Sequence, residues 1–307
     1  MRLNHKLRFG AGILPNTSWK EIIKRFKYIE ELGFDIAWTG DHFVDWSRPK
    51  DPWFELWTLL AAVAVETTYI RLGTYVTQIP FRNPALLARQ ALTVDHISNG
   101  RLELGLGTGN VTDPACEMMG LPNWSSKERV ARFKEYVEIV DKLLTNEVTT
   151  YKGRYYETKE AVMKPRPVQK PRPPITIAAI RAIMLKHAVR YADTWNSFSI
   201  GNTFEEQLEE TRKRTQLVDK YCSDIGRDLS SLRRSYLMYD VGARTGRGYG
   251  LINYYDSEKV FVDMVQKLID VGITEFLLYY PFREEQLPML EKIAREVIPE
   301  LKEKYNG

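Results

Sequence analysis

The sequence predicts an α/β fold, a (β/α)8 TIM barrel with insertions that occupies residues 1–307 as a single domain. Short apolar runs alternate with amphipathic segments almost from end to end, which is typical of βα units around a parallel sheet. Eight such runs remain when one hairpin is set aside, and eight parallel strands close this barrel. The length of 307 residues fits a barrel of roughly 250 residues with insertions, and two smaller domains are the alternative.

The first half of the chain supplies four predicted strands with helices between them. The strands are expected at Leu7–Ile13, Phe34–Trp38, Ile70–Val76 and Leu102–Leu106. The helices are expected at Ser18–Leu32, Trp53–Thr67 and Pro84–Ile97. Proline is favoured in the first turn of a helix, and Asn83 directly before it is a suitable cap.

An insertion follows the fourth strand. Its predicted parts are a long helix at Lys127–Leu144 and a hairpin formed by Val148–Tyr151 and Tyr155–Glu157. The turn residues Lys152-Gly153-Arg154 between the two runs indicate the hairpin. The eleven residues from 164 to 174 contain five prolines, whose stiff backbone suits a connector. We therefore expect the barrel to resume after this connector.

The second half completes the predicted barrel. Strands are expected at Ile175–Ala179, Ala192–Ser197, Ser235–Val241 and Ile273–Tyr279, and helices at Ala182–Tyr191 and Ser257–Val271. The glycine-rich segment Gly242–Gly250 has a low apolar content, which favours a loop over the strand ends. We expect this loop to act as a lid.

The composition excludes several classes of protein. The 44 basic and 40 acidic residues give a net charge of +4 and are spread along the chain, so no basic face predicts nucleic-acid binding. No apolar run is long enough to span a bilayer, and the first seven residues lack the apolar stretch of a signal peptide. Cys116 and Cys222 lie far apart, which fits a reducing compartment. We expect a cytoplasmic protein that binds neither membrane nor metal, since no cluster of ligands has metal spacing.

Asp41 and His42 follow the predicted strand Phe34–Trp38 directly. The carboxyl ends of barrel strands carry the chemistry of such folds. Histidine exchanges protons most easily near neutral pH, and an acidic neighbour can fix its tautomer. The alternative is a histidine that caps a helix or satisfies buried carbonyl groups.

The run Asp41-His42-Phe43, with Trp46 four residues after His42, resembles the bacterial-luciferase-like superfamily, and within it the branch that uses the deazaflavin coenzyme F420. The resemblance extends from Leu7 to Leu301. In that branch the histidine lies beside the hydride-accepting carbon and the tryptophan flanks the substrate. The resemblance implies that His42 is the general base, that Trp46 steadies developing positive charge by its π face, and that Asp41 belongs to the coenzyme site.

Two further segments resemble coenzyme-binding parts of the family. Thr74, Tyr75 and Val76 follow the third strand, where the family has a bulge with a non-proline cis peptide behind the coenzyme ring. Tyr75–Val76 is the matching bond. The run 105–109, Gly-Leu-Gly-Thr-Gly, lacks the third glycine of the dinucleotide fingerprint because position 110 is asparagine. It resembles instead the family segment in which the residues matching Thr108 and Gly109 contact the coenzyme.

The coenzyme phosphate and the substrate are less well specified. The family usually holds the phosphate with backbone amides of two glycines after the fifth strand, where this chain has Ile180-Arg181. Arg181 either adds a charge-assisted contact or is a solvated helix residue. Members that oxidise glucose 6-phosphate have a catalytic glutamate at the position of Asn110, and a lysine in the segment that here reads Phe198-Ser199-Ile200-Gly201. Asn110 cannot serve as an acid, so a sugar phosphate is disfavoured.

The resemblance therefore implies an F420-dependent oxidoreductase that moves a hydride between the coenzyme and a small organic substrate, an alcohol or else a pterin-linked carbon. It also implies a homodimer. The first alternative is an FMN-dependent luciferase-like monooxygenase, although those members more often show Glu-His-His after the second strand. The second alternative is a barrel that binds a flavin or a chromophore without turnover, which the remodelled positions Asn110, Ile180 and Arg181 would fit.

Overall fold

The computed structural model describes residues 5–46, 48–199, 201, 203–238 and 253–306 of the chain. The chain divides into two compact units. The first consists of Met1–Ile13, Arg25–Trp38 and Ala178–Gly307, and the second of Leu14–Lys24 and Thr39–Ile177. The single-domain organisation stays a prediction.

The first unit contains one part of a parallel sheet and the helices that follow its strands. Its elements in chain order are β1 (Arg8–Gly12), most of α1 (Trp19–Glu31), β2 (Ile36–Thr39), α6 (Ala182–Tyr191), β9 (Thr194–Ser197), α7 (Phe204–Asp224), β10 (Arg233–Leu237), α9 (Glu258–Asp270), β11 (Glu275–Tyr279), α10 (Leu287–Lys292) and α11 (Ile298–Asn306). Short 3-10 helices lie at Leu229–Ser231 and Glu284–Gln286, and a π-helical turn at Ile293–Val297 continues α10 into α11. Strand β1 lies inside this sheet, because its Gly10 is in register with Ile36 of β2 and with Leu277 of β11.

An apolar face on each helix accounts for the packing of this unit. Helix α9 buries Phe261, Val265 and Leu268, which recur at the spacing of one helical turn. The Phe261 ring lies 6.4 Å from the ring of Phe9 in β1, and Phe9 stacks on Phe276 of β11 at 5.1 Å. These contacts join helix and strands into one core.

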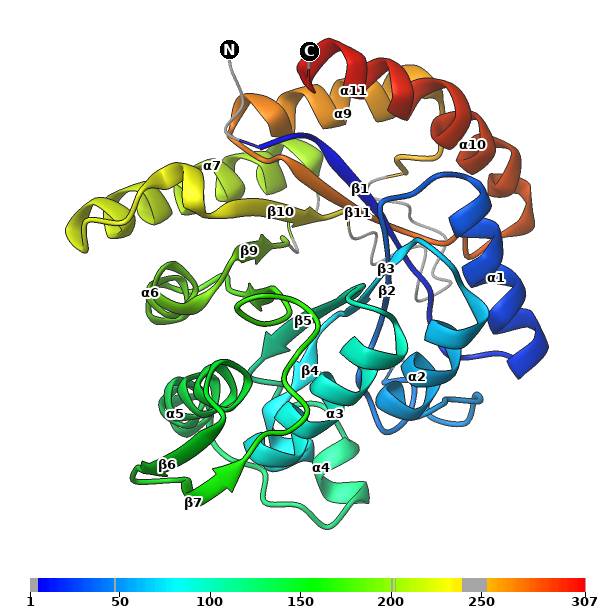
Figure 1. Ribbon diagram of the computed structural model, residues 1–307. Coiled ribbons are helices and arrows are strands. Elements are labelled where there is room, and N and C mark those ends of the chain that lie inside the picture. The colour runs from blue at the N-terminus through cyan, green and yellow to red at the C-terminus, as the bar shows by residue number, and fades with distance from the viewer. Residues whose placement is uncertain (1–4, 47, 200, 202, 239–252, 307) are drawn as a thin grey trace. The chain divides into compact units, whose positions relative to one another are not determined.

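The second unit contains the rest of the barrel sheet and the insertion. Its elements in chain order are α2 (Leu56–Glu66), β3 (Arg71–Thr74), β4 (Thr77–Gln78), a 3-10 helix (Ile79–Phe81), α3 (Pro84–Ile97), β5 (Leu102–Gly107), α4 (Ala115–Met118), α5 (Ser126–Thr145), β6 (Val148–Lys152), β7 (Glu157–Val162) and β8 (Ile175–Ala178). Strand β5 pairs in parallel with β3, β4 and β8. Figure 1 shows α3 next to α5, and the antiparallel hairpin β6–β7 beside α5.

The barrel closes through the pairing of β3 with β5. The strand order is β3-β2-β1-β11-β10-β9-β8-β5, and a further pairing joins β3 to β5. Strands β3 and β4 form one interrupted barrel strand, with Tyr75 and Val76 between them. The prediction of a (β/α)8 barrel is thereby confirmed.

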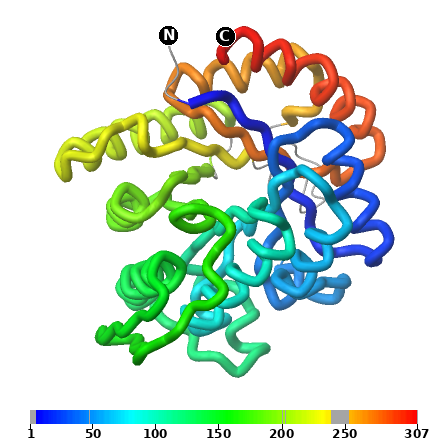
Figure 2. The backbone as a smooth tube through the Cα atoms, viewed as in Figure 1, coloured from blue at the N-terminus to red at the C-terminus, as the bar shows by residue number. Residues whose placement is uncertain are grey.

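Most predicted elements are present, with shifted ends. Helix α2 begins at Leu56, three residues later than expected, because the Glu55 carboxylate caps it by accepting the N–H groups of Trp57 and Thr58. The third predicted strand stops at Thr74. The segment 164–174 has no helix or strand and connects β7 to β8, as Figure 2 shows in green.

Several parts of the second half differ from expectation or cannot be compared with it. Helices α10 and α11, which follow the last strand, were not predicted. Helix α7 was not predicted, because its buried positions include Gln207, Thr211 and Thr215, whose polarity hides the helical pattern. The last residues of the predicted strand Ser235–Val241, and the predicted lid Gly242–Gly250, lie outside the described residues; the strand itself begins earlier, at Arg233.

Membrane-spanning helices, metal sites and cysteines of the described residues bear on function. No described helix combines the length and the apolar character needed to cross a membrane. No group of three or more His, Cys, Asp or Glu side chains in the described ranges is arranged to hold a metal ion. Cys116 and Cys222 are both buried and free, and burial, the largest influence, raises the pKa of the Cys222 thiol.

Candidate active site

His42 lies just beyond the carboxyl end of β2. The carbonyl of Thr39, the last residue of that strand, accepts a hydrogen bond from the Tyr75 N–H at 2.8 Å. This bond aligns the ends of β2 and β3, so that the segments after both strands meet. The imidazole is 24% exposed, and the Trp53 ring meets it edge-on at 5.7 Å. His42 is therefore held by its surroundings while part of the ring still reaches solvent.

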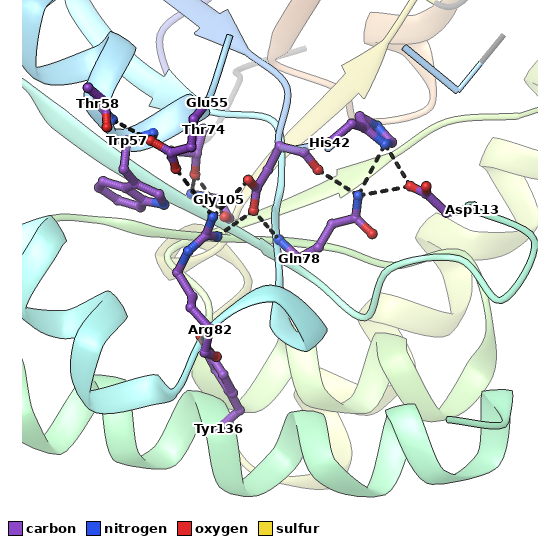
Figure 3. A network of polar contacts seen from close by, with 11 residues as sticks. His42, Glu55, Trp57, Thr58, Thr74, Gln78, Arg82, Gly105, Asp113 and Tyr136 are labelled. Carbon is purple, nitrogen blue, oxygen red and sulfur yellow. Dashed lines mark hydrogen bonds and ion pairs between the residues drawn. The ribbon is translucent and has the colours of Figure 1, made fainter. Parts of the chain in front are cut away.

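The acidic partner of His42 is Asp113, which lies between β5 and α4. Nδ1 of His42 is 2.7 Å from Oδ2 of Asp113 (Figure 3). Burial opposes ionisation of Asp113, but hydrogen bonds from His42 and from the Ala115 N–H outweigh it and lower the pKa of the carboxyl. Asp41, the neighbour of His42 in the sequence, is not this partner, because its carboxylate binds Arg82 and Gln78. Its place in the coenzyme site stays a prediction.

Asp41 is bound by Arg82 and by the backbone of Gln78. Two guanidinium nitrogens of Arg82 contact the carboxylate at 2.5 and 3.0 Å, and the Gln78 N–H donates to it at 2.9 Å. The side chains of Asp41 and Arg82 are only 3% and 8% exposed. Burial would lower the pKa of Arg82, but the hydrogen bonds and charge of Asp41 raise it overall. Glu55 lies 3.5 Å from the same guanidinium, and the Tyr136 hydroxyl donates to the Arg82 carbonyl at 3.1 Å.

Gln78 connects the two carboxylates. Its amide nitrogen donates to the backbone carbonyl of Asp41 at 2.6 Å and to Oδ2 of Asp113 at 3.3 Å. The polar network thus runs from Arg82 through Asp41 and Gln78 to Asp113 and His42. Figure 3 labels Arg82, Gln78, Asp113 and His42 of this network. Side chains from the ends of β2, β4 and β5 are joined in it.

The segment between β3 and β4 packs tightly on β5. The Thr74 hydroxyl donates to the Gly105 carbonyl and accepts the Gly105 N–H, both at 2.8 Å. The peptide bond between Tyr75 and Val76 is cis, as the family resemblance implied. A Cβ at position 107 would lie 2.5 Å from Val76. Position 107 therefore requires glycine because any side chain there would collide with Val76.

The three residues directly after β5 are Thr108, Gly109 and Asn110, and they differ in their contacts and exposure. The Thr108 carbonyl accepts a hydrogen bond from Arg129 at 3.1 Å. Gly109 has a φ of 72°, and a Cβ there would lie 2.6 Å from the Gln78 amide oxygen; both features favour glycine. Thr108 and Gly109 are half-buried, whereas Asn110 is exposed.

The remaining predicted residues make none of the contacts described in this network. Trp46 is 41% exposed on the segment after β2, and the indole that packs on His42 is that of Trp53. Ile180 and Arg181 belong to the first unit. Arg181 is exposed and precedes the first turn of α6, where its carbonyl accepts the Leu185 N–H at 2.9 Å.

The sequence did not single out Asp113 or Gln78. Asp113 carried one usable signal, since an aspartate directly before Pro114 marks the start of a helix, and its carboxylate does accept the Ala115 N–H at 2.9 Å. That signal predicts a cap but not a contact with a histidine 71 residues away. Gln78 carried no signal at all.

Fold and site together define a (β/α)8-barrel protein with ionisable side chains gathered at the carboxyl ends of its strands. Residues 2–239 match the family described as luciferase-like monooxygenase. The chain belongs to this family.

Named relatives agree with the family match. An F420-dependent glucose-6-phosphate dehydrogenase of Intrasporangium calvum is 34% identical over 325 residues, covering 92% of this chain and 95% of that enzyme. An enzyme of the same name from Amycolatopsis mediterranei is 34% identical over 224 residues, 71% of this chain and 65% of the relative, so this match spans less than two thirds of that protein. A solved structure, coenzyme F420-dependent tetrahydromethanopterin reductase from Methanopyrus kandleri, has a TM-score of 0.77 at 22% identity, covering 96% of this chain and 99% of that one. This last likeness concerns the fold alone.

Proposed function

We propose that this protein is an F420-dependent oxidoreductase that transfers a hydride between the deazaflavin and a small organic substrate, an alcohol or else a pterin-linked carbon. The observation that carries the proposal is His42, whose imidazole is 24% exposed at the carboxyl end of a barrel strand and has one ring nitrogen 2.7 Å from a buried carboxylate. Such a histidine is suited to proton transfer near neutral pH. The names of the relatives support the coenzyme.

His42 removes the proton that a hydride transfer leaves behind. When an alcohol is oxidised, the C–H bond of the carbinol carbon breaks and its electron pair leaves as hydride. The bound coenzyme supplies the carbon that accepts this hydride. The O–H bond of the substrate breaks as well, its proton passes to the imidazole of His42, and the electron pair left on oxygen forms the C=O bond. Without a base the product would be a protonated carbonyl, so proton transfer to His42 lowers the barrier.

The residues around His42 fit a bound heteroaromatic ring. Three buried polar atoms nearby have no hydrogen-bond partner within the described structure: Oγ1 of Thr39, Oγ1 of Thr77 and Nε1 of Trp53. Buried polar groups are normally paired, so a ligand with polar edges suits their surroundings. In this proposal Thr74, Tyr75, Val76, Thr108, Gly109 and Asn110 line the coenzyme, and Ile180 and Arg181 meet its phosphate. Asp41 then holds Gln78 and Arg82 in place, since these groups engage both of its carboxylate oxygens.

The side chains around the site favour an uncharged substrate. Six large apolar residues on the segments after β2 and β5 are between 36% and 50% exposed, namely Phe43, Trp46, Phe54, Val111, Met118 and Met119. Residues 108–125 contain no lysine or arginine, and phosphate recognition usually depends on such cations. We therefore place Trp46 beside the substrate and propose a neutral alcohol in preference to a sugar phosphate.

The test is turnover of the His42→Ala variant. Reduction of F420 would be followed by the loss of its visible absorbance, with 2-propanol, cyclohexanol and glucose 6-phosphate as substrates. We expect turnover of a neutral alcohol to fall roughly a hundredfold or more, with coenzyme affinity nearly unchanged, because the base acts in the transition state. His187→Ala in α6 is the matched control. Unchanged turnover in His42→Ala would remove His42 from the mechanism, and faster turnover of glucose 6-phosphate than of any alcohol would contradict the substrate class.

An FMN-dependent monooxygenase is the second candidate, and the description of the family itself favours it. A turnover assay with FMN and F420 in parallel separates the two functions. Only the monooxygenase would consume reduced FMN together with dioxygen.

The cellular location and the oligomeric state complete the proposal. Two buried free cysteines support a cytoplasmic protein. A homodimer rests on the family resemblance, and light scattering of the purified protein measures it directly.

A further inference from the structure

Asp113 is fixed in place by its own segment of chain. Its backbone N–H donates to the Asn110 carbonyl at 3.2 Å, and its Oδ1 accepts the Ala115 N–H at 2.9 Å. The residue is 4% exposed. One carboxylate oxygen is therefore committed to the start of α4, and the other, Oδ2, points to His42 (Figure 3).

The hydrogen-bond donors around His42 determine which ring nitrogen carries the proton. Asp113 is ionised at neutral pH, since its pKa lies below the usual value, so Oδ2 accepts hydrogen bonds and cannot donate one. At 2.7 Å from Oδ2, Nδ1 of His42 must be the donor.

Gln78 supports the same assignment. Its amide nitrogen lies 3.2 Å from Nδ1, but its two hydrogens point to the Asp41 carbonyl and to Asp113. The reverse orientation of the amide would place two acceptors, the amide oxygen and the Asp41 carbonyl, against each other. Gln78 therefore presents no acceptor to Nδ1, and Asp113 is the acceptor for its proton.

We propose that Asp113 is a positioning residue that holds His42 in the Nδ1–H tautomer and so makes Nε2 the atom that accepts the substrate proton. This inference deepens the proposed function and rests on it for the role of Nε2. When Nε2 is protonated, Asp113 also balances the positive charge of the imidazolium at 2.7 Å. The charged groups further along the same network are paired with one another, since Asp41 binds Arg82 and Arg82 also contacts Glu55.

The Asp113→Asn variant tests the assignment, because Asn keeps the size of the side chain. The Ala115 N–H requires an oxygen at the Oδ1 position, so the new amide nitrogen faces His42. An NH2 group there cannot accept the Nδ1 proton, and the imidazole changes to the Nε2–H tautomer. Glu117→Gln, which removes an exposed carboxylate from the same segment, is the matched control.

The tautomer is read from ¹⁵N chemical shifts of the imidazole nitrogens, without coenzyme or substrate. The chain has only four histidines, and the His42→Ala spectrum assigns the signals of His42. At about pH 8.5, above the ordinary histidine pKa of about 6.5, we expect the Nδ1–H form in the wild type and in Glu117→Gln, and the Nε2–H form in Asp113→Asn. The same Nε2–H form in the wild type would overturn the proposal.

Kinetics provide the second measurement. In Asp113→Asn we expect kcat to fall at least tenfold with little change in KM, because the proton-accepting atom is blocked. Without the negative charge of Asp113 beside it, the imidazolium that forms during the reaction is also less favourable, which adds to the loss of kcat. If the tautomer changes in Asp113→Asn but the wild type shows no F420-dependent turnover, the positioning role stands and the proposed function is contradicted. Wild-type turnover with no tautomer change in Asp113→Asn contradicts the positioning role alone.

Discussion

At the residue scale, the site depends on an ion pair that does not touch the reacting atoms. Asp41 and Arg82 are almost fully buried, and two buried charges are tolerated only when they are paired and hydrogen-bonded. Arg82 contacts both carboxylate oxygens of Asp41, and the Gln78 N–H donates a further hydrogen bond to one of them. The pair thus fixes Gln78, which in turn contacts Asp113.

Removing Arg82 therefore has a predictable cost. We expect Arg82→Gln to lower the free energy of unfolding by about 3–5 kcal/mol, because the Asp41 carboxylate stays buried without a cation. The double variant Asp41→Asn/Arg82→Gln should lose less than the sum of the single changes. Urea denaturation measures all three, and Lys220→Gln, from an exposed pair with Asp224, is the control that should leave stability nearly unchanged. A loss below about 1 kcal/mol in Arg82→Gln would show that the pair is not important for stability.

The same residues show what the sequence could predict of the site. His42 was found because it follows an apolar strand, a local pattern that also placed it at the carboxyl end. Asp113 and Gln78 reach His42 only through the folded sheet, and no spacing along the chain records that contact. For the same reason, the sequence does not show that Val76 closely approaches Gly107, the last residue of β5.

At the element scale, one glutamate on α5 holds the inserted hairpin. The Glu135 carboxylate accepts the backbone N–H groups of Arg154, Tyr155 and Tyr156 at 2.9, 2.8 and 3.2 Å. These groups lie in the turn between β6 and β7. The adjacent Arg132 guanidinium stacks on the Tyr155 ring, 4.5 Å from its centre, so the turn is bound to the helix from two sides.

Loss of this carboxylate should loosen the hairpin alone. For Glu135→Ala we expect faster hydrogen exchange of the amides at 154–156, with local stability reduced by about 1–3 kcal/mol, since three donors lose their acceptor. Exchange in β5 and turnover with F420 should not change. Mass spectrometry of exchanged peptides makes the measurement, and Glu157→Gln on β7 is the control. Equal exchange rates in Glu135→Ala and wild type would show that the turn does not need the helix.

Element boundaries were predicted well where capping residues are local. Helix α3 begins at Pro84 and ends at Ile97 as expected, with Asn83 accepting the Ala85 N–H. Helix α7 was missed because its buried face is partly polar, and the Tyr236 hydroxyl donates to Gln207 of that face at 2.8 Å. A polar residue can be recognised as part of the core only when its hydrogen-bond partner on another element is known.

At the scale of the whole molecule, the alternation of strands and helices was enough to predict the barrel. The strand order and the β3–β5 pairing confirm it. The chemistry of the molecule is a separate matter, because this fold supports many reactions and function depends on the site. The names of the relatives support the proposed coenzyme, and the side chains around His42 support the proposed class of substrate.

The most direct test of the central claim, that the coenzyme is a deazaflavin, is a binding titration of the purified protein with F420 and with FMN in parallel, followed by fluorescence. We expect F420 to bind with a micromolar or lower Kd, on the order of −8 kcal/mol, and FMN to bind much more weakly. FMN copurifying at full occupancy, or FMN binding more tightly than F420, would contradict the account.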